Sequence, residues 1–313
     1  MISLIRSGLS NTKIDFMRVH KLALLMSVFS IIGSIALVLI KGLNFGIDFS
    51  GGVLIEARIG KDLDMAKVRE LIDVQVKDVQ MQNVDKEDLL IRVPKTSAEQ
   101  SCVIKKIQEI LSKNFANVEY RKVDYVGPQV GSELILKGIM ALLLSFVFIM
   151  IYIWVRFDWQ FGLGGIFALI HDAILTLGFY AITGLEFNLT SIAAILTIIG
   201  YSINDSVVIY DRIRENFRRY KNAPVKSASK ERSELEKKNL RDLINSSVNS
   251  TLSRTILTSG VTLVSILALI LFGGETLYSF SMAAFFGIVI GTYSSIYISA
   301  PILIYLDPRK SSS

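Results

Sequence analysis

The sequence is poor in the residues from which most enzyme active sites and disulfide frameworks are built. Its 313 residues include one cysteine and two histidines. A single Cys102 excludes an internal disulfide and predicts a buried or idle thiol. No zinc-type spacing, no Ser/His/Asp nucleophile arrangement and no phosphate-binding loop is present. We therefore expect no metal, no cofactor, no ATP hydrolysis and no enzyme activity from this chain.

Positive charge is absent from two short loops, "TGLEFN" and "FGGET". Lys and Arg gather instead before the first apolar stretch, at Arg156, from Arg212 to Arg241, and at Arg309 and Lys310. Because basic residues mark cytoplasmic loops, this alternation predicts that both termini are cytoplasmic. The net charge of +6 is then a topology signal, and a nucleic-acid partner is not expected.

Apolar residues are abundant: 51% of the chain is hydrophobic and the mean hydropathy is +0.47. A helix needs about 20 predominantly apolar residues to cross a hydrocarbon core of about 30 Å. Six stretches meet this length, at 20–40, 134–155, 161–182, 189–210, 255–273 and 278–305. The predicted fold class is a polytopic α-helical membrane protein with six transmembrane helices.

The first apolar stretch also has the basic flank of a secretory signal peptide. Its apolar core is longer than that of a signal peptide, and "SIALVLIKG" offers no small-x-small cleavage site. We interpret this stretch as a retained signal anchor that follows a cytoplasmic N-terminus at 1–19.

Residues 41–133 have the alternating polar and apolar texture of a small soluble domain, predicted to be periplasmic. Strand patterns occur in "GIDFSGGVLIEARI", in "KDVQMQNV" and "EDLLIRVP" around a turn at Asp85 and Lys86, and in "NVEYRKVDYVG". Helical spacing occurs in "DMAKVRELIDVQV" and "SAEQSCVIKKIQEILSKNF". The order β-α-β-β-α-β predicts an α+β ferredoxin-like domain.

Two connecting segments have their own patterns. In "VGPQVGSELILKG", residues Gly127, Pro128 and Gly131 are expected to break regular structure and to form a hinge, with an ordinary boundary turn as the alternative. The basic connection at 211–254 is predicted to be cytoplasmic, with helical ends and a mobile centre at 224–233, and a tail at 306–313 is also placed in the cytoplasm.

The stretch "GYSINDSVVIYDRIREN" places a carboxylate inside an apolar segment. Asp205 lies six residues before Asp211, so its Cα is about 9 Å further into the span. Tyr201, Ser202 and Asn204 surround it with a polar patch that is expected to face other helices. An acid in this position is costly unless it has a function or a partner.

Burial disfavours the charged form of a carboxyl group, whereas a nearby cation favours it. Asp205 between these effects can load and release a proton. Arg254, at the start of the fifth stretch, is the candidate cation; the alternative is an arginine that extends to the interface only as an anchor.

His171 and Asp172 lie near the middle of the third stretch. One interpretation makes them a second element of a proton relay. The other makes them a structural polar pair, with Asp172 bonded to Thr176 or to a neighbouring helix. Small residues in "GLGGIFA", "TSG" and "SMAAFFGIVIGTYSS" predict close helix packing, and Gly287 and Gly291 have GxxxG spacing.

Five motifs together resemble one family. They are "LNFGIDFSGG", "VGPQVGSEL", "HD", "GYSINDSVVIYDRIREN" and "LSRTILTSG", in this order along the chain. The chain resembles the SecF subunits of the SecDF accessory complex of bacterial protein export, which are similar in turn to the resistance-nodulation-division (RND) transporters. The resemblance covers most of the chain.

This resemblance implies a subunit of the bacterial inner membrane that pairs with SecD and associates with SecYEG and often YajC. It implies use of the proton-motive force to draw exported preproteins outward after the ATP-driven steps of SecA. The proton-carrying acid maps to Asp205 and its basic partner to Arg254. Two other functions stay open from the residues alone: a proton-coupled small-molecule exporter subunit of the RND type, and a purely structural assembly subunit.

Overall fold

The computed structural model describes residues 14–59, 65–74, 76, 79–83, 88–93, 100–115, 118–221 and 240–306. The turn predicted at Asp85 and Lys86 and the centre predicted at 224–233 lie outside the described residues. The chain divides into two compact units. Unit 1 comprises residues 1–43, 142–185 and 190–313, and unit 2 comprises residues 44–141 and 186–189.

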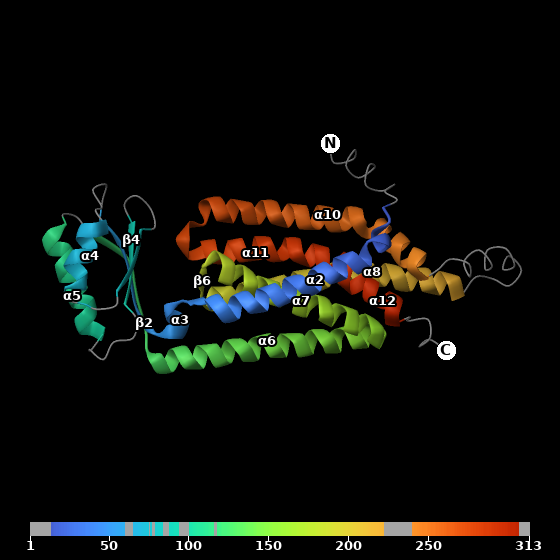
Figure 1. Cartoon of the computed structure of the whole chain (residues 1–313), viewed down its shortest axis with the longest axis horizontal. Helices are drawn as coiled ribbons and strands as arrows, with labels where there is room; N and C mark the ends of the chain where they lie inside the picture. The colour runs from blue at the N-terminus through green and yellow to red at the C-terminus, as the bar shows by residue number, and fades with distance from the viewer. Residues whose placement is uncertain are drawn as a thin grey trace, which may run out of the picture. The chain divides into compact units, whose positions relative to one another are not determined.

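Within the described residues, six helices are long and apolar enough to cross a membrane. They are α2 (His20–Lys41), α6 (Pro128–Arg156), α7 (Trp159–Thr183), α8 (Leu189–Lys221), α10 (Leu240–Phe272), and α11 (Gly274–Ser294) with the segments that continue it (Figure 1). The segments that continue α11 are η2 (Ser295–Ser299), which is π-helical, and α12 (Ala300–Leu306). The prediction of a polytopic helical membrane protein is confirmed.

Helices α8 and α10 run well beyond their apolar segments, as "DRIRENFRRY" and "LRDLINSSVNSTLSR" predict. Neither extension contains Pro or Gly, so nothing interrupts the hydrogen-bond ladder. Glu215 accepts from Arg212 at 2.6 Å and from Arg219 at 2.7 Å. Pairs three and four residues apart such as these support the helical conformation.

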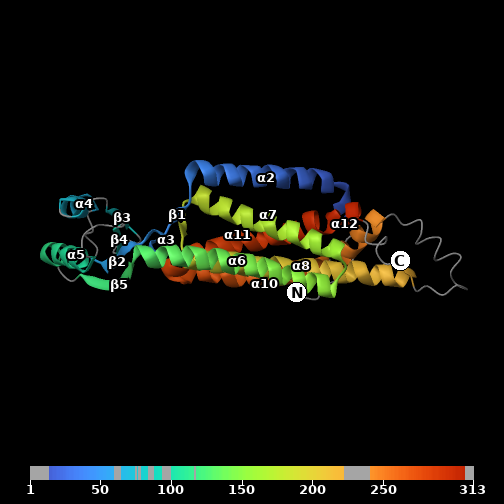
Figure 2. The same ribbon diagram turned by 90° about the horizontal axis from the view of Figure 1, so that it is seen from below.

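Three of the spans form the interior of unit 1. In α7, α8 and the final span, at least half of the residues in an apolar 18-residue segment of the helix are buried. In α2, α6 and α10, only a small part of the corresponding segment is buried. The outer helices expose large apolar side chains, including Phe29, Leu39, Phe148 and Val155. Such surfaces are stable against lipid rather than water. In Figure 2, α2 lies alongside α7, consistent with the many contacts between these helices.

Glycines allow these helices to approach closely. A Cβ on Gly287 would lie 2.2 Å from Ile198 Cδ1, and one on Gly291 would lie 3.1 Å from Ser202 Cβ. The GxxxG pair of α11 therefore packs against α8 of the same chain. Gly178 of α7 is similarly close to Ser34 of α2. The predicted close packing is confirmed, and its partner here is internal.

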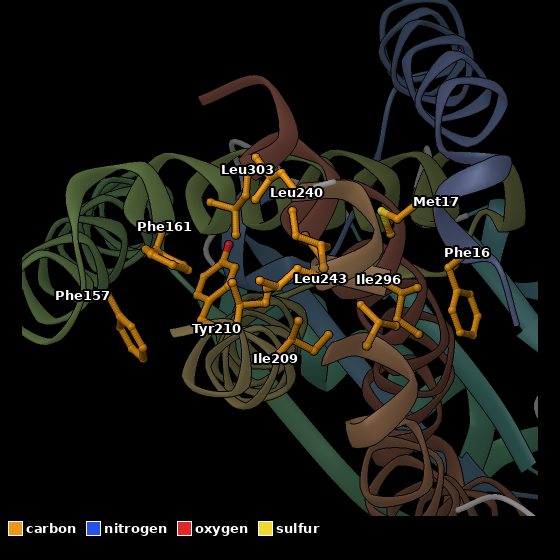
Figure 3. Packing of buried hydrophobic residues seen from close by; sticks show 14 of the residues in the cluster. Phe16, Met17, Phe157, Phe161, Ile209, Tyr210, Leu240, Leu243, Ile296 and Leu303 are labelled. Carbon is orange, nitrogen blue, oxygen red and sulfur yellow. The ribbon is translucent and has the colours of Figure 1, made fainter. Parts of the chain in front are cut away.

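One buried apolar cluster, at the end of unit 1 that contains Arg156 and Arg212, joins several helices. Figure 3 shows Phe157, Phe161, Ile209, Tyr210 and Leu243 among its side chains. The Tyr210 ring lies 5.1 Å from that of Phe161, and its hydroxyl accepts from Ser299 at 2.6 Å. We call this end of unit 1 the basic end.

The N-terminal segment is attached to α10 at the basic end. Phe16 and Met17, in the 3-10 helix η1 (Phe16–Arg18), are buried in the same cluster. Asn249 donates to Ile14 O at 2.8 Å and accepts from Ile14 N at 3.0 Å. His20 contacts Met17 O through Nδ1 and the Tyr305 hydroxyl through Nε2.

Unit 2 contains a four-stranded antiparallel sheet with α4 (Met65–Asp73) and α5 (Gln100–Asn114) against one face (Figure 1). The strands are β2 (Gly52–Arg58), β3 (Gln80–Asn83), β4 (Asp88–Val93) and β5 (Glu119–Val126), in the spatial order β3-β4-β2-β5. Ile55, Ile91 and Ile107 are fully buried between the sheet and the helices. Alternation along β2 and β4 therefore provides the core of this unit.

The alternation in "GIDFSGGVLIEARI" predicts a single strand, and this prediction is wrong. Ile47–Ser50 forms a short helix, α3, and only the part from Gly52 joins the sheet. Ser50 Oγ donates to Gly46 O at 3.0 Å, and Gly51 ends α3 with φ +70°, a conformation that favours glycine. Phe49 is buried as a result.

A second, two-stranded sheet joins segments far apart in the sequence. β1 (Asn44–Phe45) pairs in parallel with β6 (Glu186–Phe187). Arg92 of β4 forms an ion pair with Glu186, and Leu189 N donates to Asp48 Oδ2 at 3.0 Å. The loop "TGLEFN" is therefore held by the segment around α3, a connection that the sequence patterns do not predict.

The predicted break at Gly131 is wrong. α6 begins at Pro128 and continues through Gly131, so only Gly127 separates it from β5. A Cβ on Gly131 would lie 2.9 Å from Phe49 O. Gly131 is thus a site of close approach between α6 and α3, and a hinge stays a prediction for Gly127 and the start of α6 at Pro128.

Candidate functional site

Helix α8 positions two polar residues of the predicted patch towards the interior of unit 1. Ser202 and Asp205 are 1% and 2% exposed. They are three residues apart, so they share one face of the helix. Ser206 is also buried, whereas Asn204 is exposed. Asp205 is therefore buried as predicted, and Asn204 does not face the interior.

Asp205 has one side-chain hydrogen-bond partner among the described residues. Ser259 Oγ of α10 donates to Asp205 Oδ2 at 3.5 Å, a long and weak bond. Ser259 Oγ also lies 2.9 Å from Thr292 Oγ1 of α11. A carboxylate can accept about four hydrogen bonds, so Asp205 is poorly satisfied for its burial.

Arg254 does not form an ion pair with Asp205 within the described residues. Its side chain is exposed, and it precedes Ser259 by five residues, which is about 7.5 Å along α10. Its charge still interacts with Asp205 by Coulomb attraction over a longer range. The two residues predicted as a pair are therefore neighbours without direct contact.

His171 and Asp172 of α7 form a separate polar cluster. His171 Nδ1 donates to Asp172 Oδ1 at 2.9 Å. Asp172 Oδ2 accepts from Ser202 Oγ at 2.5 Å and from Ser294 Oγ at 2.7 Å. Asp172 is fully buried and accepts three hydrogen bonds from α7, α8 and α11. We call these four residues the Asp172 cluster.

Of the two alternatives predicted for Asp172, a bond to a neighbouring helix is the one observed, through Ser202 and Ser294. Thr176 Oγ1 donates instead to the main-chain oxygen of Asp172 at 2.7 Å. The Ser202 hydroxyl donates its hydrogen bond to Asp172 rather than to Asp205. Tyr201 contributes a buried hydroxyl that has no hydrogen-bond partner within the described residues.

The hydroxyl donors Ser259, Thr292 and Ser294 were not predicted as site residues. They occur in "LTSG" and "GTYSS", where small residues indicate helix packing. Their signal was the recurrence of Ser and Thr inside apolar helices, but which of them face inward depends on how α10 and α11 are rotated.

Other candidate chemistry is limited. No group of three or more His, Cys, Asp or Glu that could hold a metal ion is present in the described parts of the chain. Cys102 is a free, exposed thiol on α5. The arrangement in unit 1 thus offers two buried carboxyl groups, one with a single weak donor and one with three donors. Proton binding is the chemistry that such groups can support.

The chain is similar to known proteins of bacterial protein export. Residues 106–309 match the family "Protein export membrane protein SecD/SecF, C-terminal", and residues 36–62 match "SecD/SecF GG Motif". The chain is 51% identical to the protein translocase subunit SecF of Rickettsia bellii, over 95% of this chain and 94% of that protein. It is 52% identical to that of Rickettsia felis, over 95% and 92%.

Solved structures show the same similarity. SecDF, a translocon-associated membrane protein from Thermus thermophilus, matches with a TM-score of 0.80 and 34% identity, over 95% of this chain and 39% of that chain. SecDF in a super-membrane-facing form matches with a TM-score of 0.66 and 32% identity, over 96% and 40%. The chain thus spans less than half the length of these SecDF chains.

Proposed function

The chain belongs to the SecD/SecF family of protein export membrane proteins, and from this premise we propose that it is a proton-driven subunit of the Sec translocase. Its near full-length similarity to SecF subunits favours that role over a small-molecule exporter. Acting with SecD, it would use the proton-motive force to promote export of unfolded preproteins through SecYEG.

The observation that carries the proposal is the burial of Asp205 with one weak donor. Among the described residues, the carboxylate is held by the 3.5 Å bond from Ser259 and by distant attraction to Arg254. Protonation removes the buried charge and ends the attraction to Arg254. Each state therefore favours a different spacing between α8 and α10, and a ligand that distinguishes two states shifts their populations.

A proton that enters from the periplasm and leaves to the cytoplasm would drive α8 and α10 through this cycle. The basic distribution supports a topology with both termini in the cytoplasm of a bacterial inner membrane. Residues 41–133 would then be periplasmic. The element order and the strand order β3-β4-β2-β5 support a ferredoxin-like fold for them.

Association with SecD is proposed to use an exposed stripe on α8. Ala193, Thr197, Gly200 and Asn204 are exposed at spacings of four, three and four residues, so they lie on one face. Small and polar residues favour helix contacts in membranes, whereas lipid favours the large apolar residues seen on α2 and α6. SecYEG, YajC and the preprotein are further proposed partners, for which family membership is the support.

The test is Asp205→Asn, which removes the proton-binding group and keeps its size. Inner-membrane vesicles that contain the variant with SecD are assayed for preprotein export with and without a proton gradient. We expect the gradient-dependent stimulation to be abolished and co-purification with SecD to be unchanged. Asp211→Asn is the matched control, because Asp211 lies on the same helix but is exposed. Full stimulation in Asp205→Asn would refute the proposal.

The two rival functions predict other results. A purely structural assembly subunit would tolerate neutralising Asp205 and Arg254 together, or exchanging them as Asp205→Arg with Arg254→Asp. A small-molecule exporter would give altered drug sensitivity on deletion without a secretion defect. The same vesicles and strains therefore separate all three.

A further inference from the structure

We propose that His171 is a second proton-accepting group, oriented by Asp172, whose charge state controls how firmly α7 holds α8. This inference rests on the proposed function only in one respect, namely that the chain uses protons to promote export. Its structural basis is the Asp172 cluster, which the cycle at Asp205 does not use.

The first observation concerns the two nitrogens of His171. Nδ1 is 2.9 Å from Asp172 Oδ1, and a carboxylate can only accept, so Nδ1 carries a hydrogen. Nε2 is buried and has no hydrogen-bond partner within the described residues, although His171 is only 1% exposed. Because the Asp172 carboxylate fixes Nδ1 as the nitrogen that carries hydrogen, Nε2 of the neutral imidazole keeps its lone pair and can accept a proton. This is the arrangement by which carboxylates orient catalytic imidazoles.

The second observation is that Asp172 is satisfied without a proton. Its two oxygens accept from His171, Ser202 and Ser294, which come from three helices. A protonated carboxyl would place a fourth hydrogen among these donors. Asp172 is therefore suited to remain a carboxylate, and His171 Nε2 is the open position where a proton can be added.

Among the residues that the structure describes, few other titratable groups lie on the helices around His171. On its own helix the neighbour is Asp172. From α11, the Tyr293 ring lies 6.3 Å away, with its hydroxyl donating to Ala23 O of α2 at 3.0 Å. α8 contributes Asp205, one turn beyond Ser202. The nearest fixed charge to an imidazolium would thus be Asp172 itself.

The third observation links this cluster to Asp205. Ser202 donates to Asp172 and precedes Asp205 by three residues, about 4.5 Å along α8. Ser294 lies at the end of α11, immediately before the π-helical segment η2. π-Helical segments are rare and are frequent at functional sites. A change in the Asp172 bonds would therefore act on α8 close to the proposed proton carrier.

The step is a simple protonation. The Nε2 lone pair takes a proton from a hydronium ion, which becomes water; the imidazole becomes a cation, and Asp172 stays an anion that now faces a full positive charge. Asp172 is drawn towards His171, and its acceptance from Ser202 weakens. Loss of the proton restores the hold on α8.

The experiment uses nitrogen-15 NMR of the full chain in lipid nanodiscs, with only its histidines labelled. The chain has two histidines, and His20→Gln identifies the His171 signals by elimination. We expect the His171 Nε2 signal to change from the neutral to the charged form during a titration from about pH 9 to about pH 5. A single protonation state throughout would overturn the inference.

The functional arm uses His171→Asn in the vesicle export assay. The asparagine amide can still donate to Asp172 from the position of Nδ1, but it has no group at the position of Nε2. We expect at least a tenfold loss of gradient-dependent stimulation, as for removal of a general acid-base group. Unchanged stimulation would refute the relay role, because a structural pair needs only the retained donor.

The two proposals fail separately. If Asp205→Asn keeps full stimulation while His171 titrates, the proposed function is wrong and the protonation of His171 stands. If Asp205→Asn abolishes stimulation while His171 does not titrate, the proposed function stands and this inference is wrong. His20→Gln is the matched control, because it removes the other histidine of the chain, which lies outside the Asp172 cluster.

Discussion

Replacing Gly287 by alanine tests the contact between α8 and α11 that brings the polar residues together. The added Cβ would lie 2.2, 2.4 and 2.9 Å from three side-chain carbons of Ile198. Favourable carbon contacts lie at about 3.5–4.0 Å, so all three are overlaps. Ile198 is 1% exposed and its side chain is confined. Overpacking of this kind costs about 1–3 kcal/mol.

The expected loss of stability in Gly287→Ala is opposite in sign to the usual effect of replacing glycine by alanine in a helix. Alanine in place of glycine inside a helix usually stabilises by roughly 0.5–1 kcal/mol. Gly260→Ala on α10 is the matched control, because nothing lies within 4 Å of its added Cβ. In thermal unfolding of the purified chain in detergent, we expect Gly287→Ala to lower the apparent midpoint and Gly260→Ala to leave it unchanged or raise it.

Ile198→Ala provides the rescue, since it removes all three overlapping carbons. Alone it should destabilise by about 2–5 kcal/mol through the cavity that it leaves. Combined with Gly287→Ala, the loss should be smaller than the sum by about 0.5–3 kcal/mol, the range of coupling between residues in contact. If Gly287→Ala behaves like Gly260→Ala, or if the two losses simply add, the described packing of α8 on α11 is wrong.

Two further predictions concern unit 2. Gly131→Ala should lower the apparent unfolding midpoint, by about 1–2 kcal/mol in stability, because its Cβ would meet the main-chain oxygen of Phe49 at 2.9 Å; Gly33→Ala, with open space around it, is the control, and equal behaviour of the two would contradict the close approach. Glu186→Gln should leave the partly buried Arg92 without its anionic partner and loosen the β1–β6 pair. Hydrogen exchange at Gly46 N, which donates to Phe187 O, should then accelerate about tenfold for a loss of about 1.4 kcal/mol, and an unchanged rate would show that Arg92 does not stabilise the pair.

The transmembrane helices could be predicted from sequence because the bilayer permits few alternatives. A segment of sufficient apolar length must satisfy its backbone internally, so hydropathy alone identifies it. The ends of α8 and α10 were harder to place by hydropathy. A helix that leaves the membrane keeps the same hydrogen bonds while its side chains change from apolar to charged, and helical propensity rather than apolar content marks its continuation.

The short helix α3 could not be predicted from alternation in "GIDFSGG". Its conformation depends on Gly51 at φ +70° and on contacts of Asp48 and Phe49 with residues more than 130 positions later. Local patterns contain no information on such partners. The same limit applies to Gly131, whose role depends on α3 lying against it.

At the candidate site, the burial of Asp205 followed from its place in an apolar segment, but its donor Ser259 did not. Ser259 and its own partner Thr292 lie on helices whose rotation is set by packing along their whole length. Arg254 is a case in which the sequence leaves two alternatives open. An arginine at the start of a span can be the partner of a buried acid, but its long side chain can also extend to the surface, and Arg254 is exposed here.

The bond between Asp48 and the first residue of α8 has a mechanical consequence. Leu189 N donates to Asp48 Oδ2 at 3.0 Å, and α8 runs without interruption for 16 residues from there to Asp205. An α-helix is stiff along its axis, and this length is about 24 Å. A displacement of α8 along its axis would therefore pull or push on Asp48, within the short helix α3 that Gly51 ends at φ +70°.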